Sequence, residues 1–302
     1  SSVLDRSSAW LPGDNAFGAG DYPGDVWLTT GRPAPEVGNR SYQTIRHELG
    51  HALGLKHGHE RGGPGRTAVP ADRDSLEFTV MTYRSFEGGP LRWSNEEFGF
   101  PQSFMMLDIA ALQEMYGANY DYNSGNTTYR WHSVTGEMSI NGVPQGRPGG
   151  GATRADPNNI FLTIWDGGGR DTYDMSNYGN GVSIDLEPGS WSVLSPDQLA
   201  FLGTDASGVD HFARGNVFNA LPDPHQAVQQ NVIENAIGGA GDDTIKGNTA
   251  GNHLDGRGGS DTLSGLDGRD TLSGGDGDDE LNGGNGTDQL NGGNGVDQLN
   301  GG

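Results

Sequence analysis

A repeat of nine residues constrains this chain more than any other feature. It begins at Gly238 and runs in unbroken register to Asn300. Its units are GGAGDDTIK, GNTAGNHLD, GRGGSDTLS, GLDGRDTLS, GGDGDDELN, GGNGTDQLN and GGNGVDQLN, each with Asp or Asn at place six and Ile or Leu at place eight. A flexible Gly/Asn/Asp linker has no reason to keep an aliphatic residue at this spacing. The pattern therefore predicts a parallel β-roll that binds Ca²⁺.

The chemistry of the repeat explains this prediction. Glycine permits the positive φ angles of a tight loop, and carboxylate and carbonyl oxygens suit a hard cation. Without metal, the acidic segment has too little core and too much repulsion to stay ordered. Consecutive loops face opposite sides, so each calcium is expected between repeats n and n+2. The expected calcium-binding residues here are Gly239, Gly241, Asp243, Asn252, Gly259, Asp261, Gly268, Asp270, Gly275, Gly277, Asp279, Gly284, Gly286, Asp288, Gly293, Gly295 and Asp297.

Charge and composition exclude several partners. The chain has 40 acidic and 18 basic residues, a formal charge of −22, so neither nucleic acid nor an anionic membrane is expected to bind it. Cysteine is absent, which rules out disulfides. No apolar run is long enough for a membrane span, and the first residues, SSVLDRSSAW, show no signal peptide.

The rest of the chain divides into two parts of different character. Residues 1–116 read as mixed α/β, with a helix over SYQTIRHELGHALGL that ends at Gly54 and a second helix over PQSFMMLDIAALQEMYG. The apolar stripe of the first helix is expected at Ile45, Leu49, Ala52 and Leu53. Residues 117–237 read as β-rich, with strands at NNIFLTIWD and GVSIDLE.

The stretch HELGHALGLKH suggests a catalytic metal site. On a helix, His47 and His51 share one face, and Glu48 beside them can reach a metal-bound water without ligating the metal. Gly54 can end the helix and bring His57 back as a third ligand. Three imidazoles leave one position open on a tetrahedral zinc ion, which is the catalytic arrangement. The alternative is a solvated helix that happens to be rich in histidine.

Several segments together resemble the serralysins, a metzincin family of secreted zinc endopeptidases. HELGHALGLKH fits the metzincin pattern, TVMTYRS resembles the Met-turn with Met81 beneath the zinc, and FLTIWDGGGRDTYD is similar to a serralysin calcium loop. The resemblance implies that Glu48 is the general base and that Tyr83 is a displaceable zinc ligand and oxyanion donor. Without it, Met81 and Tyr83 would be ordinary packing residues.

The resemblance also implies the fold class and further sites. The fold is α+β: a partial metzincin catalytic domain in residues 1–116, an all-β serralysin-like domain in residues 117–237, and the β-roll in residues 238–302. Ala9 and Trp10 would lie on a strand that binds substrate by β-addition. The implied calcium ligands outside the repeats are Asn123, Gly125, Thr127, Asp166, Gly168 and Asp171.

The sequence also departs from the family. After the third ligand the family continues with proline, whereas this chain has Gly58, His59 and Glu60. The family has further strands and a helix before the first histidine, so we expect that parts at both ends are missing. The alternative function is therefore an inert, truncated calcium-binding module for secretion or interaction. The resemblance implies a monomer that is exported without a signal peptide, acts on proteins or peptides, and has a proteinaceous inhibitor as a candidate partner.

Overall fold

The computed structural model describes residues 8–9, 24–28, 32–62, 66–151, 157–226 and 232–302. These form two compact units. The first comprises Ser1–Ala118, Phe161–Thr163 and Ala200–Ala213, and the second comprises Asn119–Ile160, Ile164–Leu199 and Arg214–Gly302. The first division falls within two residues of the boundary that the sequence suggested. No helix in the described ranges has the length and apolar character that a membrane span requires.

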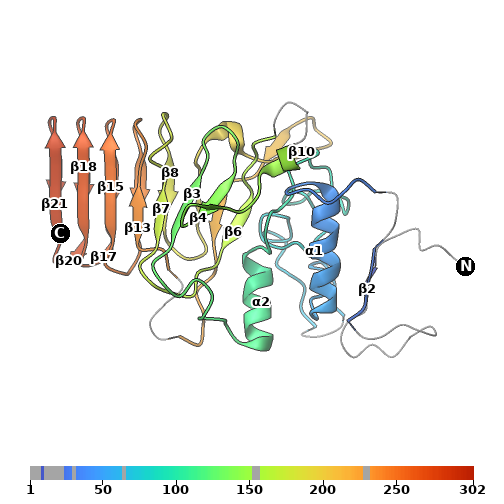
Figure 1. The fold of residues 1–302 in the computed structure, drawn as a ribbon. Helices are drawn as coiled ribbons and strands as arrows, with labels where there is room; N and C mark the ends of the chain where they lie inside the picture. Colours follow the sequence, from blue (N-terminus) through green and yellow to red (C-terminus); the bar gives the residue numbers. More distant parts are fainter. Residues whose placement is uncertain (1–7, 10–23, 29–31, 63–65, 152–156, 227–231) are drawn as a thin grey trace, which may run out of the picture. The chain divides into compact units, whose positions relative to one another are not determined.

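The first unit contains both α-helices of the described chain (Figure 1). Two short antiparallel strand pairs accompany them. The elements are β1 (Ser8–Ala9), β2 (Val26–Trp27), α1 (Arg40–Ala52), α2 (Met106–Tyr116), β10 (Phe201–Thr204) and β11 (Asp210–Phe212). A further strand, β6 (Leu162–Ile164), begins in this unit. Helix α1 carries the histidine motif.

Local chemistry sets both ends of α1. The Asn39 side chain accepts a hydrogen bond from the Tyr42 backbone N–H at 2.9 Å, which caps the first turn. At the other end, Gly54 adopts a φ of +98°, a left-handed value that a residue with a Cβ resists. The predicted helix and its stop at Gly54 are therefore confirmed.

The predicted apolar stripe of α1 is wrong. Leu49 is 42 % exposed, whereas His47 is 2 % exposed and His51 is 9 % exposed. The buried face of α1 is the histidine face, because its imidazoles and the Gln43 amide find backbone acceptors inside the unit. Similarly, α2 buries Met106 and its acidic residue Asp108 but leaves Met115 exposed.

The second unit is almost entirely β-sheet. Its strands are β3 (Thr128–Trp131), β4 (Met138–Ile140), β5 (Val143–Pro144), β7 (Thr172–Asp174), β8 (Ser183–Asp185), β9 (Trp191–Ser192), β12 (Val217–Asn219), β13 (Asn235–Ile237), β14 (Thr244–Lys246), β15 (His253–Gly258), β16 (Thr262–Ser264), β17 (Asp267–Gly268), β18 (Thr271–Asp276), β19 (Glu280–Asn282), β20 (Asn285–Gly286), β21 (Gln289–Asn294) and β22 (Gln298–Asn300). Two short 3₁₀ turns, Pro148–Gly151 and Pro196–Gln198, complete it.

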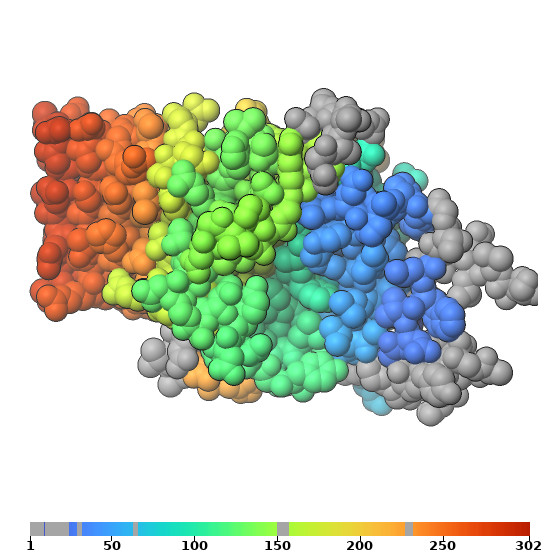
Figure 2. All heavy atoms as spheres, viewed as in Figure 1, coloured from blue at the N-terminus to red at the C-terminus, as the bar shows by residue number. Residues whose placement is uncertain are grey.

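The repeats form a parallel β-roll with two large sheets and a short third sheet made of β17 and β20. One large sheet has the order β21-β18-β15-β13-β7-β3-β4-β5, and the other large sheet has the order β22-β19-β16-β14-β8. Paired residues are 18 apart, as in Ile245↔Leu263 and Leu254↔Leu272. Each repeat therefore pairs with the next but one, and the expectation that calcium lies between repeats n and n+2 remains a prediction. In Figure 2 the repeats, coloured orange to red, appear as regular rows of atoms.

The aliphatic residues of the repeat make the core of the roll. Ile245, Leu254, Leu263, Leu272 and Leu281 are each at most 1 % exposed. The loops pack so closely that a Cβ on Gly277, which has a φ of +131°, would overlap the Gly259 carbonyl oxygen. The sheets do not stop at Gly238: β8 pairs in parallel with β14, and β7 pairs in parallel with β13. The part of residues 117–237 that belongs to the second unit thus shares continuous sheets with residues 238–302.

Candidate functional site

Helix α1 and the turn after it bring three histidines together. His47 and His51 lie one turn apart on the buried face, and the chain reverses at Gly54 to return His57. One ring nitrogen of each residue lies within 4.8 Å of one nitrogen of each of the others. The closest pair is His51 Nε2 and His57 Nε2, which are 3.1 Å apart. The three residues that the sequence singled out are therefore brought into one group.

The hydrogen bonds of the Nδ1 atoms show how the imidazoles of His47 and His51 are oriented. His47 Nδ1 is 2.9 Å from the Val80 carbonyl oxygen, and His51 Nδ1 is 2.8 Å from the Leu55 carbonyl oxygen. Carbonyl oxygens only accept, so both Nδ1 atoms carry the proton in this arrangement. The Nε2 lone pairs of these rings therefore point toward the shared centre.

The buried ring nitrogens at that centre disfavour protons but could bind a cation. His47 Nε2 is buried and has no hydrogen-bond partner among the described residues. Burial lowers the pKa of His47 to about 3, with a contribution from its neighbours His51 and His57, and burial also lowers the pKa of His51. Protons are thus disfavoured at the two rings, while a metal ion would satisfy the converging lone pairs. Three imidazole nitrogens form the donor set that zinc commonly takes.

Glu48 follows His47 on α1 and is itself only 7 % exposed. Burial raises the pKa of its carboxyl to about 7, and the positive charge of Arg32 offsets part of this rise. A carboxylate whose pKa lies near neutral pH can both accept and return a proton. The position and the proton affinity of Glu48 suit a general base.

The turn around Met81 packs against α1 next to the histidine group. Met81 is 2 % exposed and packs so closely on Gly50 of α1 that a Cβ there would overlap the Met81 sulfur. The preceding residue, Val80, uses its carbonyl oxygen to accept from both His47 and Gln43. Met81 is therefore in direct contact with α1, and its assignment to a Met-turn remains a prediction.

Asp108 on α2 holds that turn, and sequence reasoning missed it. Its carboxylate accepts from Thr79 Oγ1 at 2.5 Å, from the Val80 N–H at 2.7 Å and from the Met105 N–H at 3.0 Å. Burial raises its pKa to about 6, although these hydrogen bonds oppose the rise. The available signal was an acidic residue in the first turn of a helix whose next four residues, 109–112, are apolar.

Tyr83 and Trp93 form the wall beside the histidines. The Tyr83 hydroxyl is 2.8 Å from His57 Nε2, and the Tyr83 ring stacks on His47 with a centroid separation of 5.3 Å. The Trp93 ring meets His47 edge-on at 5.7 Å, and its indole N–H donates to the Thr82 carbonyl. The Tyr83 hydroxyl thus lies against the metal-facing nitrogen of the third histidine.

His59 and Glu60, which follow the third histidine, both contact its ring. Glu60 Oε1 lies 2.8 Å from His57 Nδ1, so the third histidine is oriented by a carboxylate where the other two are oriented by backbone carbonyls. The pKa of Glu60 is lowered by its hydrogen bond and its charge interaction with His57, against an opposing effect of burial. His59 stacks on His57 at 5.5 Å, and His57, His59 and Glu60 form a second group with metal-ligand spacing.

A separate cluster of oxygens lies in the second unit, where the sequence predicted a calcium loop. Asp171 Oδ1 accepts from the Thr127 N–H at 2.8 Å, whereas its buried Oδ2 has no partner in the described part of the chain. Burial, and then the charge of Asp166, raise the pKa of Asp171 to about 8. The hydroxyl of Thr127 lies 2.9 Å from the Gly125 carbonyl oxygen, to which it donates a hydrogen bond, and 3.4 Å from the Asn123 carbonyl oxygen.

The same cluster contains one more carboxylate that the sequence did not reveal. Glu234 Oε2 accepts from the Asp171 N–H at 2.8 Å. Gly168, with a φ of +132°, donates its N–H to Asp166 Oδ1. The charges of Asp166 and Glu234 both act on Asp171, and carboxylate oxygens are ligands that Ca²⁺ prefers.

The sixth residues of the repeats form a ladder along the roll. The backbone N–H of Asp243 donates to Asp261 Oδ1 at 2.7 Å, and the N–H of Asp261 donates to Asp279 Oδ1 at 2.8 Å. The same contact recurs, 18 residues apart, from Asn252 to Asp270, from Asp270 to Asp288 and from Asp279 to Asp297. Seven repeats contain five pairs of the type n and n+2, and the five rungs correspond to these five pairs.

The second oxygen of these carboxylates faces the loops. Within the described ranges, Oδ2 is buried without a hydrogen-bond partner in Asp261, Asp270, Asp279 and Asp288. Burial, followed by the charges of Asp243 and Asp279, raises the pKa of Asp261 to about 7. A cation at these positions would satisfy the free oxygens and keep the carboxylates ionised.

Asn252 differs from the six aspartates. Its amide nitrogen donates to the Glu234 carbonyl at 2.9 Å and to Asn248 Oδ1 at 3.1 Å. A hydrogen-bond donor thus stands between two acceptor oxygens at this repeat. Asn252 remains one of the expected calcium-binding residues, and because an amide replaces a carboxylate there, we expect its site with Asp270 to be the weakest in the roll.

Comparisons with known families agree with this geometry. The RTX calcium-binding nonapeptide repeat matches residues 237–272 and 264–299. The family described as Peptidase M10 serralysin C terminal matches residues 118–196. This is a serralysin-type chain. Its repeats are RTX calcium-binding repeats, and its second unit contains the serralysin C-terminal domain.

Individual serralysins and related proteins are similar over most of the chain. Serralysin from Proteus mirabilis is 35 % identical over 260 residues, which cover 82 % of this chain and 44 % of that protein. Metallopeptidase AprA from Pseudomonas marginalis is 32 % identical over 81 % of this chain and 45 % of its own length. Serralysin C from Dickeya chrysanthemi is 37 % identical over 67 % of this chain and 35 % of its own length. The chain spans less than half the length of each of these relatives.

One feature of the serralysin resemblance lies partly outside the described residues. Ala9 belongs to β1, which pairs antiparallel with β2, but Trp10 is not described. The expectation that these two residues bind substrate therefore stays a prediction.

Proposed function

We propose that this protein is a secreted zinc-dependent endopeptidase that hydrolyses peptide bonds in proteins and is stabilised by calcium. One observation carries the proposal: the Nε2 atoms of the three histidines converge, while buried His47 Nε2 has no partner among the described residues. His47, His51 and His57 would hold the metal. A zinc ion bound there supplies a Lewis acid that polarises a carbonyl and lowers the pKa of water.

Glu48 is the proposed general base. It accepts a proton from the attacking water and returns it to the leaving amine, which its raised pKa permits. It lies beside the histidine group on the same helix, so that it can act without ligating the metal.

Tyr83 and Glu60 have supporting roles in this proposal. The Tyr83 hydroxyl, 2.8 Å from His57 Nε2, would be a displaceable further ligand of the metal and would donate a hydrogen bond to the developing oxyanion. Glu60 accepts from His57 Nδ1 and keeps Nε2 of that ring free to bind the metal.

Calcium has a structural role in this proposal. One ion is assigned to the cluster of Asp166, Asp171 and Glu234, and further ions to the loops between repeats n and n+2. These ions neutralise the carboxylates whose pKa values burial raises, and so they hold the roll together at neutral pH.

The expected partners are protein or peptide substrates and a proteinaceous inhibitor, and the protein is proposed to be a monomer. Its high negative charge opposes binding to nucleic acid and membranes. Export without a signal peptide is part of the proposal and rests on the likeness to the serralysins.

Zinc titration combined with a hydrolysis assay tests the proposal. The full chain, stripped of transition metals and kept in calcium, is titrated with zinc by calorimetry, and the same samples are assayed on casein. The expected result is one tight zinc and hydrolysis that rises with zinc occupancy. Tight zinc binding without hydrolysis at full occupancy would instead support the alternative, an inert calcium-binding module for secretion or interaction.

A further inference from the structure

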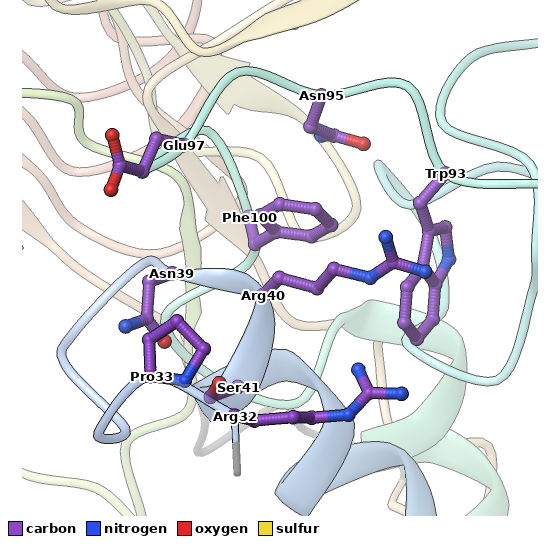
Figure 3. Close-up of a pocket in the computed structure, with 9 residues that line it drawn as sticks. All are labelled: Arg32, Pro33, Asn39, Arg40, Ser41, Trp93, Asn95, Glu97 and Phe100. Atoms are coloured by element: carbon purple, nitrogen blue, oxygen red, sulfur yellow. The ribbon is translucent and has the colours of Figure 1, made fainter. Parts of the chain in front are cut away.

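A pocket in the first unit carries two positive charges beside the histidine group. It has a volume of about 230 Å³, roughly seven times that of one water molecule in the liquid, and Arg32, Arg40, Trp93 and Phe100 help to line it. In Figure 3 both guanidinium groups extend toward Trp93, and Glu97 lies on the opposite side of the pocket. A paired positive charge is unusual on a chain of formal charge −22.

Arg40 is held in position within this pocket. Its guanidinium carbon lies 5.7 Å from the centroid of the Trp93 ring, within the range of a cation–π contact. The indole in turn is fixed by its hydrogen bond to the Thr82 carbonyl, and Phe100, which is 3 % exposed, forms a rigid apolar wall. Arg32 and Glu97 each have interactions of their own. Arg40 is therefore the residue on which a ligand's charge would chiefly act.

Trp93 connects the pocket to the histidine group. Its ring contacts Arg40 and lies 5.7 Å from the His47 ring and 5.9 Å from the Tyr83 ring. Along α1, Arg40 precedes His47 by seven residues, about 10 Å at the rise of an α-helix. An extended peptide covers this distance in about three residues.

We propose that this pocket is a substrate subsite for a carboxylate located two to three residues from the scissile bond. The planar guanidinium of Arg40 would bind the carboxylate with two parallel hydrogen bonds, and Arg32 would add a second positive charge. The carboxylate belongs either to an Asp or Glu side chain or to the free C-terminus of a short peptide. This inference rests on the proposed endopeptidase function.

A peptide panel tests the subsite. Nine-residue peptides with one cleavable bond carry a single Glu or Gln at each of the first four positions on either side of that bond. A C-terminal acid and its amide are compared in the same way. The expected result is a preference for the carboxylate of about tenfold in kcat/KM at one position, two or three residues from the bond.

Two substitutions make the test specific. Arg40→Gln should reduce the ratio of Glu to Gln peptides at that position to near one. Arg92→Gln, which removes an exposed arginine outside the pocket, should leave the ratio as it is in the wild type. A wild-type ratio near one at every position, or a preference that survives Arg40→Gln, would overturn the subsite.

A binding measurement separates this proposal from the proposed function. The same peptides are titrated by calorimetry into Glu48→Gln and into Glu48→Gln combined with Arg40→Gln. Tighter binding of the acidic peptide that depends on Arg40 supports the subsite even if the wild type cleaves nothing. Cleavage by the wild type without any carboxylate preference would leave the endopeptidase standing and refute the subsite.

Discussion

The substitution Asn252→Asp should turn the weakest calcium site expected in the roll into a tight one. The Asn252 side chain is 2 % exposed, and its amide donates to the Glu234 carbonyl and to Asn248 Oδ1. The new carboxylate loses both hydrogen bonds, each worth about 1 kcal/mol net, and faces two acceptor oxygens. Without calcium, the free energy of unfolding should therefore fall by about 3 kcal/mol.

Calcium should reverse that loss. The new carboxylate, the Glu234 carbonyl and Asn248 Oδ1 form an oxygen-only donor set, which Ca²⁺ prefers. A ligand at 100 times its Kd stabilises the folded state by about 2.7 kcal/mol, close to the expected loss. The stability of the variant in saturating calcium should thus approach that of the wild type.

Thermal unfolding and calorimetric calcium titration of the full chain check both effects. Asn282→Asp is the matched control, because it adds the same charge at an exposed strand position of the roll. The control should change neither the number of calcium ions nor the metal-free stability by much. An Asn252→Asp variant with unchanged calcium affinity and unchanged metal-free stability would refute the reasoning.

Three further predictions concern the two metal regions. Tyr83→Phe should lower kcat by about 10²–10³-fold with a smaller effect on KM, because it removes a hydrogen-bond donor to the oxyanion. If steady-state kinetics show an unchanged kcat, Tyr83 has only a packing role. Asp108→Asn should weaken zinc binding about tenfold in a competition assay, because it loosens the Val80 carbonyl that orients His47, and equal affinity would exclude this role. Calcium affinity should rise with pH through about 7, where Asp261 loses its proton, and pH-independent titrations would contradict this.

The same raised pKa sets the sign of a stability effect. Between the ordinary pKa of an aspartate and the value of about 7 at Asp261, the folded metal-free roll binds more protons than the unfolded chain does. The metal-free roll should therefore lose stability as the pH rises through this range, whereas the calcium-bound roll should gain it. Chemical denaturation with and without chelator at several pH values tests both directions.

The repeat region could be predicted from the sequence in detail, because its constraints are local and periodic. One aliphatic residue in nine specifies the core, and the spacing of 18 residues between partners follows from loops that alternate between two sides. The end of the repeat motif at residue 237 does not mark the end of the sheets, because β7 and β8, which carry no repeat motif, join the same sheets as the repeats.

The histidine site was predictable for a different reason. Its first two histidines lie one helical turn apart and Gly54 ends the same helix, so local rules place all three residues. Asp108 and Glu234 were not predictable, because each acts on a segment far away in sequence: Asp108 on Val80 and Glu234 on Asp171. The apolar stripe of α1 was misread, because polar acceptors inside the unit bury the histidine face instead.

The most direct test of the zinc site measures metal content and turnover on the same samples of the wild type and of Glu48→Gln. Inductively coupled plasma mass spectrometry gives zinc per chain, and hydrolysis of a fluorogenic peptide gives the rate. The account predicts one zinc per chain in both proteins and turnover in the wild type alone, because the substitution removes the base and leaves all three ligands. Loss of zinc from Glu48→Gln would make Glu48 a ligand, and turnover that survives the substitution would remove it from catalysis.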